Sequence, residues 1–301
     1  MKVYIIGMGA LGVMYADHIK EHGGDVAFVM DRERLARSEG RPVICNGREQ
    51  TFAMVDAAKA DPADLVITAV KYSGLKPAIQ TMRRCVGADT ILMSVMNGIS
   101  SEDIIAETYG SGRMIYTVAQ GMDAMKAGNV LKYTQMGELC IGRKEPAQKS
   151  NVERVAAYFD SIGMPYTVDD DIMHRIWGKF MLNVGVNQTC MAYGTTYEGV
   201  LLPGEPHDIM LEAMHEVIAA ANAEGIALGE EDVDFYVGLL GKLDPDGYPS
   251  MAQDRVARRY SEVEMFAGTV IPICEKHKIP APANRKLYEM VKAIEKEYGQ
   301  G

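Results

Sequence analysis

The sequence predicts an α/β N-terminal domain followed by an all-α C-terminal domain, and three observations indicate this fold class. In the first half of the chain, short apolar runs alternate with helical patterns, as in a parallel sheet covered by helices. A glycine-rich turn directly follows the first apolar run. After the acidic run at residues 169–171, helical patterns dominate. A length of 301 residues suits two domains, which we predict at residues 1–168 and 169–301.

Composition and charge narrow the classes of function. The net charge of −10 argues against a nucleic-acid surface, because binding to phosphate backbones needs clustered Lys and Arg. A small anionic ligand remains compatible, since a few local cations can hold it. The first apolar run is too short for a signal peptide or a membrane span, so we expect no membrane attachment. The five cysteines show no CxxC spacing and are expected to be reduced core thiols of a cytoplasmic protein.

The glycine-rich turn reads Gly7-Met-Gly9-Ala-Leu-Gly12 and joins a predicted strand, residues 2–6, to a predicted helix. A second predicted strand follows at residues 26–30. This order is typical of a Rossmann-type dinucleotide-binding domain, in which the helix N-terminus faces the pyrophosphate. A turn of purely structural purpose is the alternative, and the strand–turn–helix–strand order favours the cofactor site. The expected cofactor-binding residues of this turn are Gly7, Gly9, Ala10, Leu11 and Gly12.

The end of the second strand decides which nucleotide is bound. Asp31 stands there, 19 residues after Gly12, where a carboxylate accepts from a ribose 2′-hydroxyl and repels a 2′-phosphate. Arg32 and Arg34 follow at once, and either side chain could hold a 2′-phosphate. The choice between NAD(H) and NADP(H) therefore stays open at this point.

Two further predicted strands end in polar residues. Lys71 closes the run that begins at Asp64, and Asn97-Gly98 closes the run that begins at Thr90. Ligands of open α/β sheets bind beyond the carboxyl ends of the strands, so Lys71 and Asn97 are predicted to lie at the cofactor crevice. The alternative is a solvated strand end and a simple turn.

Beyond this region the expected elements are less regular. Residues 128–133 and 138–142 are predicted to be antiparallel strands appended to the sheet. In the second half, the helical patterns that follow the segment around Lys179 cover residues 206–224, 231–243, 250–277 and 283–298.

A polar stripe marks an otherwise apolar helix in the second half. Lys179, Asn183 and Asn187 recur every four residues, which places them on one helix face over about 12 Å. The other faces of this segment are apolar, so the helix is predicted to be buried. Burying an ammonium group costs several kcal/mol unless something pairs with it, and an anionic ligand is such a partner. A lysine that extends to the surface is the alternative.

Ser250 and Glu262 stand near the start of the helical pattern at residues 250–277. Taken alone, Ser250 is expected to cap this helix. Glu262 would then pair with Arg258 or Arg259 one helical turn earlier. Both assignments are structural, and only the wider context points to chemistry.

Several short motifs occur in a characteristic order along the chain. They are Gly7-Met-Gly9-Ala-Leu-Gly12, Val70-Lys71, Met96-Asn97-Gly98, the stripe of Lys179, Asn183 and Asn187, Ser250-Met-Ala-Gln-Asp254, Arg259-Tyr-Ser-Glu262, Gly268, and Ile279-Pro-Ala-Pro282-Ala-Asn284. In this order and spacing, the chain resembles the ketopantoate reductases (2-dehydropantoate 2-reductases) over nearly its full length. The resemblance implies a Rossmann domain, an all-helical domain and an active site in the cleft between them. It also implies hydride transfer from NADPH to a branched, anionic 2-keto acid, and it leaves a homodimer open.

The resemblance also assigns roles to individual residues. It implies that Lys179 is the general acid, which suits a reaction that creates an alkoxide. By the same likeness, Asn97, Asn183 and Asn187 orient the substrate and the lysine. A substrate-binding role for Ser250 and for Glu262, which would accept from the substrate hydroxyl, is implied in the same way.

The chain departs from the family pattern at three positions. Asp31 stands where the family often has an Arg for the 2′-phosphate, Gln188 where it has a Pro, and Tyr197 where it has an Asn. A reductase of another branched or aromatic 2-keto acid, a D-2-hydroxyacid dehydrogenase, is therefore the nearest alternative.

Two other classes of protein share parts of the pattern. A non-catalytic dinucleotide-binding sensor would keep the glycine turn without needing Lys179 together with Glu262. The β-hydroxyacid dehydrogenases also place an Asn four residues after a helical Lys, but the segment from Ser250 to Glu262 favours the ketopantoate reductases.

Overall fold

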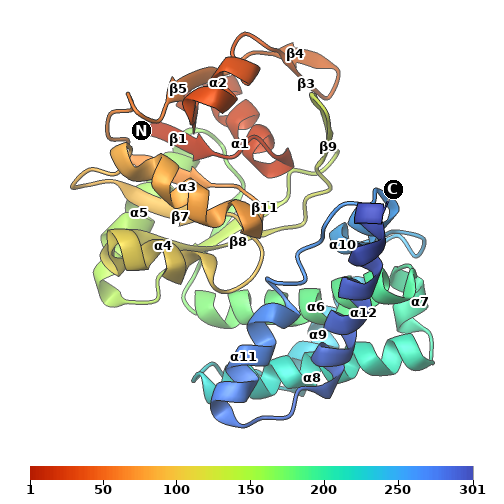
Figure 1. Ribbon diagram of the computed structural model, residues 1–301. Helices are drawn as coiled ribbons and strands as arrows, with labels where there is room; N and C mark the ends of the chain where they lie inside the picture. Colours follow the sequence, from red (N-terminus) through yellow and green to blue (C-terminus); the bar gives the residue numbers. More distant parts are fainter. Residues whose placement is uncertain (301) are drawn as a thin grey trace. The chain divides into compact units, whose positions relative to one another are not determined.

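The structure, a computed structural model, describes residues 1–300 of the chain (Figure 1). The chain divides into two compact units, Met1–Ile172 and a second unit that begins at Met173. The first unit is built around a mostly parallel sheet, and the described part of the second is helical. This confirms the predicted fold class of a Rossmann-type domain followed by an all-α domain. Among the helices at residues 1–300, none has the length and apolar character of a membrane span.

The main sheet of the first unit has eight strands in the order β12-β11-β8-β7-β6-β1-β2-β5. Their bounds are β1 Lys2–Ile6, β2 Asp25–Met30, β5 Ala53–Asp56, β6 Leu65–Thr68, β7 Ile91–Ser94, β8 Met114–Gln120, β11 Glu138–Gly142 and β12 Tyr166–Asp169. All neighbours from β5 to β8 are parallel, so their carboxyl ends share one edge of the sheet. Helices on a parallel sheet bury both of its faces, which explains why these strands are almost continuously apolar.

Helices follow the strands of the first unit, as the alternation in the sequence predicts. They are α1 Ala10–Glu21, α2 Arg32–Ser38, α3 Leu75–Thr81, α4 Ser101–Tyr109 and α5 Lys149–Ser161. The core joins strand residues such as Ile5, Phe28 and Ile67 to Met14 of α1 and Phe159 of α5. All five cysteines of the chain are buried, as expected for core thiols.

A second, smaller sheet corrects one sequence prediction. It contains β4 Arg48–Gln50, β3 Val43–Cys45, β10 Val130–Lys132 and β9 Met125–Ala127, in that order. The run at residues 128–133 therefore does not extend the main sheet, because β10 pairs with β3 and β9 instead. The run at residues 138–142 forms β11, which is antiparallel to β8 as predicted.

The second unit consists of helices grouped around α6. They are α6 Ile172–Tyr193, α7 Tyr197–Leu201, α8 Glu205–Ala223, α9 Glu230–Leu240, α10 Ser250–Val256, α11 Ala267–His277 and α12 Pro282–Lys296. Neighbouring helices approach α6 closely where it carries glycine. A Cβ atom added at Gly178 would lie 2.5 Å from the Tyr236 ring, and one at Gly185 would lie 2.5 Å from the Met214 side chain.

The prediction of a single helix at residues 250–277 is wrong, because helix α10 ends at Val256. Arg258 has a φ of 50°, in the left-handed region that ends helices. Arg259 turns back and donates its backbone N–H to the carbonyl oxygen of Asp254 and its side chain to Asp254 Oδ1 at 2.7 Å. This double contact holds the break and separates α10 from α11.

Candidate active site

The glycine turn after β1 has the geometry of a dinucleotide cradle. Gly7 has a φ of +114°, and a Cβ there would overlap the carbonyl oxygen of Ala69. A Cβ at Gly12 would overlap the carbonyl oxygen of Gly7, so α1 can lie against the strand only without a side chain here. At Gly9 the nearest atom to an added Cβ is the Ala69 oxygen at 3.7 Å. Protein atoms therefore leave room beside Gly9 for a ligand.

Helix α1 starts at Ala10 with Gly9 as its N-cap, and no side chain caps it. The first N–H groups of a helix have no partner within the helix and carry the positive end of its dipole. Together with the space beside Gly9, this end of α1 fits a pyrophosphate group. The sequence-predicted residues Ala10 and Leu11 lie in this first turn.

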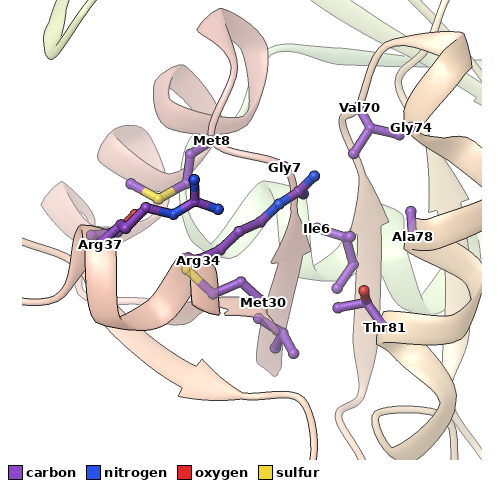
Figure 2. Close-up of a pocket in the computed structure, with 12 residues that line it drawn as sticks. Ile6, Gly7, Met8, Met30, Arg34, Arg37, Val70, Gly74, Ala78 and Thr81 are labelled. Carbon is purple, nitrogen blue, oxygen red and sulfur yellow. The ribbon is translucent and has the colours of Figure 1, made fainter. Parts of the chain in front are cut away.

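A pocket of about 270 Å³ extends from the glycine turn along the end of β2 (Figure 2). The lining residues come from the ends of β1 and β2, from α2 and from the segment around α3. They are Ile6, Gly7, Met8, Val29, Met30, Arg34, Arg37, Ser38, Val70, Gly74, Ala78 and Thr81. Figure 2 shows Arg34 and Arg37 extending from α2 into the pocket, opposite Ala78 and Thr81. Two cations in a pocket lined otherwise by apolar residues, glycines and the hydroxyl groups of Ser38 and Thr81 suit the adenosine end of a phosphorylated dinucleotide.

The structure gives Asp31 a structural task that the sequence analysis did not consider. Asp31 is the N-cap of α2, where it accepts from the backbone N–H of Arg34 at 2.8 Å. Its second oxygen lies 3.5 Å from Arg34 Nε. Arg32 is exposed and is absent from the pocket lining, whereas Arg37 lines it. The spacing of Arg37, three residues after Arg34 on the same helix, was the signal that could have identified it.

Lys71 and Asn97 both follow strands that end at the carboxyl edge of the sheet. Lys71 is exposed just beyond β6, between Val70 and the short helical turn that contains Gly74, and both of these neighbours line the pocket. Asn97 is half-buried in the loop between β7 and α4, where Gly98 has a φ of +90°. The structure thus brings both to the edge predicted for them, and their roles stay predictions.

The polar stripe lies on α6, whose other faces are packed in the core. Lys179 and Asn183 are half-buried, and Asn187 is 8% exposed. Asn187 Nδ2 donates to the hydroxyl of Ser250, the first residue of α10, at 3.3 Å. Pro249, not Ser250, is the N-cap of α10. The contact joins two predicted site residues that are 63 positions apart in the sequence.

Gln188, one of the departures from the family pattern, faces the core rather than the polar stripe. Its Oε1 accepts from the backbone N–H of Ala267 at 3.0 Å, and its Nε2 donates to the Val184 carbonyl at 2.8 Å and to Asn284 Oδ1 at 3.3 Å. The side chain is fully buried. Gln188 therefore ties α6 to the starts of α11 and α12.

Glu262 is half-buried in the segment between α10 and α11. The helical pairing expected with Arg258 or Arg259 needs a continuous helix, which this segment is not. Arg259 pairs with Asp254 at 2.7 Å, and Arg258 donates to the Glu297 carbonyl at 2.7 Å. Each arginine therefore has a partner other than Glu262.

Arg255 of α10 is a supporting residue that the sequence analysis missed. Its guanidinium donates to the carbonyl oxygens of Met191 and Ala192, the latter at 3.0 Å, at the end of α6. These are carbonyls that a helix leaves without partners, and a cation there also complements the helix dipole. Arg255 thus binds α10, which carries Ser250, to the helix of the polar stripe.

Two family models match the chain. Residues 3–146 match the ketopantoate reductase PanE/ApbA model, and residues 171–295 match the ketopantoate reductase PanE/ApbA C-terminal model. The chain belongs to the ketopantoate reductase family. It is an oxidoreductase of the 2-dehydropantoate 2-reductase type.

A curated relative agrees with this membership, and two solved structures share the fold. The 2-dehydropantoate 2-reductase of Streptococcus pyogenes is 26% identical over 98% of both chains. A PanE/ApbA family ketopantoate reductase from Ralstonia eutropha has a TM-score of 0.87 at 24% identity. The match covers 99% of this chain and 100% of that chain. D-Mandelate dehydrogenase, solved with NADH and anilino(oxo)acetate, has a TM-score of 0.87 at 22% identity with the same coverage. These two structures share the fold of this chain.

Membership of the family indicates the class of cofactor and the class of substrate. The cofactor is a nicotinamide dinucleotide, and the glycine turn and the adjoining pocket have the space and charge to fit it. The substrate of this enzyme family is a keto acid.

Proposed function

We propose that the chain reduces 2-dehydropantoate (ketopantoate) to pantoate. The observation that carries this proposal is the α6 stripe: Lys179 and Asn183 are half-buried, and Asn187 is bonded to Ser250 in a chain of the ketopantoate reductase family. The names of the relatives support the same substrate.

When bound, the reduced nicotinamide supplies a hydride to the keto carbon. Lys179 acts as general acid and transfers a proton from its ammonium group to the keto oxygen, which becomes the hydroxyl of the product. Its positive charge also stabilises the negative charge that develops on this oxygen. Asn183 and Asn187 orient the lysine and the substrate. The bond from Asn187 leaves Ser250 its own proton, which it can donate to a substrate carboxylate.

The test of this mechanism is the Lys179→Ala variant. We expect turnover to fall by about 10²–10⁴-fold, the usual contribution of general acid catalysis, while dinucleotide binding measured by fluorescence stays unchanged. Lys276 is a matched control, because it is exposed and pairs with Glu224 on the surface of the helical unit. Near-normal turnover of Lys179→Ala would remove this lysine from the mechanism.

We further propose that the cofactor is NADPH and that Arg34 and Arg37 hold its 2′-phosphate. Both arginines line the pocket, and Asp31, which would repel a phosphate, is engaged as the cap of α2 and lies against Arg34. Replacing Arg37 by Ala should raise the apparent KM for NADPH by about 10-fold or more and leave that for NADH nearly unchanged. Arg32→Ala, on the same helix but outside the pocket lining, is the matched control. A preference for NADH in the wild-type enzyme would assign Asp31 to the ribose instead.

Tyr197 favours a second candidate substrate class, another branched or aromatic 2-keto acid. Its ring lies against Gly247, where an added Cβ would be 3.0 Å from the ring, and its backbone N–H donates to the Gly247 carbonyl. Gly247 belongs to the loop that leads into Ser250, so an aromatic residue here alters the surroundings of a proposed substrate contact. The two candidates are separated by comparing kcat/KM for ketopantoate with kcat/KM for phenylglyoxylate and for branched 2-keto acids that lack the hydroxyl group.

A further inference from the structure

A chain of buried hydrogen bonds closes the base of the loop that carries Asn97. Ser94 ends β7 and Ser101 begins α4, and their hydroxyl oxygens are 2.8 Å apart. Ser101 donates to Glu102 Oε2 at 2.7 Å, and the backbone N–H of Met96 donates to the Ser94 hydroxyl at 3.3 Å. Both serines and Glu102 are at most 3% exposed, so water does not compete for these bonds.

With Ser101 donating to the Glu102 carboxyl group, the available protons give this chain a single direction. A serine hydroxyl has one proton to donate. Because Ser101 gives its proton to Glu102, the bond between the serines must be donated by Ser94. The Ser94 oxygen then accepts from the N–H of Met96, the residue before Asn97. Glu102 is therefore the terminal acceptor, and it sets the donor and the acceptor of each hydrogen bond from Ser101 to the N–H of Met96 in the loop.

Glu102 is itself held from several sides. The backbone N–H groups of Glu102 and of Thr117 on β8 hydrogen-bond to its carboxyl group, although complete burial is the larger influence and raises its pKa to about 7. The next residue anchors the other side of the same helical turn. Asp103 accepts from the Tyr116 hydroxyl at 2.7 Å and pairs with Lys144 at 3.1 Å. The start of α4 is thus a firm support for the loop.

We propose that Glu102 is a positioning residue for Asn97 and acts through Ser101 and Ser94. The inference rests on the proposed function and on the role that the family resemblance implies for Asn97, which is to orient the substrate at the carboxyl edge of the sheet. Without the terminal acceptor, the two hydroxyl groups lose their common direction, and the loop of residues 95–100 gains other conformations. A displacement of about 1 Å in a positioning group can lower the rate by up to 10²-fold.

The experiment combines kinetics with a double-mutant cycle. Glu102→Ala should lower kcat/KM for the keto acid by about 10-fold, whereas Glu107→Ala, at an exposed position of the same helix, should leave it unchanged. In the Asn97→Ala background, Glu102→Ala should lower kcat/KM by less than about 2-fold, because coupled residues are not additive. Glu102→Gln, whose amide oxygen can still accept from Ser101, should restore most of the activity.

Hydrogen–deuterium exchange gives a readout that does not depend on catalysis. Exchange of residues 95–100 should accelerate in Ser101→Ala and Glu102→Ala and not in Glu107→Ala. Ser101→Ala cuts the chain while it leaves the carboxyl group in place, so it also serves if Glu102→Ala does not fold. Its loss of kcat/KM should match that of Glu102→Ala, and combining the two should add little.

Three results would overturn the inference. An equal loss from Glu102→Ala with and without Asn97 would show that Glu102 acts on something else. Unchanged kinetics of Ser101→Ala would show that the chain of hydrogen bonds does not position Asn97. Unchanged kinetics of Asn97→Ala would show that Asn97 has no role in the reaction for Glu102 to support. A wild-type protein that reduces no keto acid would instead refute the proposed function.

Discussion

Replacing Glu102 by Gln should change how stability depends on pH. Burial raises the pKa of the Glu102 carboxyl group from 4.5 to about 7 in the folded protein. The folded state therefore binds more protons than the unfolded state between these values, so stability from this group is full at low pH and is lost as the pH rises through 7. A pKa change of this size corresponds to roughly 3 kcal/mol. Most of it, about 2–3 kcal/mol, should be lost between pH 5 and pH 8.

The measurement is the free energy of unfolding by urea, taken from pH 5 to pH 8 for the wild-type protein and for Glu102→Gln. The difference between the two should change by about 2–3 kcal/mol over this range, with the wild type losing stability relative to the variant. Only this slope is diagnostic, because the new amide N–H₂ group is also buried and shifts the absolute stability at every pH. Glu107→Gln, at an exposed position of α4, should run parallel to the wild type.

Parallel curves for wild type and Glu102→Gln would refute the reasoning, since they would mean that the carboxyl group titrates alike in both states. A wild type that gains stability relative to the variant as the pH rises would refute its sign. In that case the hydrogen bonds from Ser101 and the backbone would outweigh burial and hold the pKa below 4.5.

Three further outcomes test other parts of the structure. Gly12→Ala should destabilise the protein by about 1–3 kcal/mol in urea unfolding and raise the dinucleotide Kd, because its Cβ would overlap the Gly7 carbonyl oxygen. Gln188→Leu should lose about 1–3 kcal/mol by leaving the buried N–H of Ala267 without an acceptor, with little effect on KM. Glu262→Gln should lower kcat/KM sharply for ketopantoate and much less for a keto acid without the hydroxyl, at a nearly constant Tm. A variant whose kcat/KM equals that of the wild type on both substrates would remove Glu262 from substrate binding.

Features that depend on near neighbours in the chain follow from the amino-acid sequence alone. Gly7 and Gly12 are required by a turn of a few residues, and the order of strand, turn and helix around them specifies the cradle. The stripe from Lys179 to Asn187 follows from the helical repeat alone. Parallel strands share one edge for their carboxyl ends, which placed Lys71 and Asn97 correctly at that edge.

Features that depend on distant or aperiodic contacts are visible only in the folded chain. Residues 250–277 have a helical pattern, yet the Asp254–Arg259 pair and the left-handed Arg258 interrupt the helix. Within residues 128–133, strand β10 pairs with β3, which lies far away in sequence, and pairing partners leave no local pattern.

Side-chain direction was likewise beyond the sequence. Arg32, Arg34 and Arg37 differ little in sequence context, and the path of α2 decides that the last two enter the pocket. Serine and glutamate are common surface residue types, and only the packing shows that Ser94, Ser101 and Glu102 are buried and joined by hydrogen bonds. Periodicity records which face of an element is apolar, whereas the partner of a buried polar group is set by whatever element packs against it.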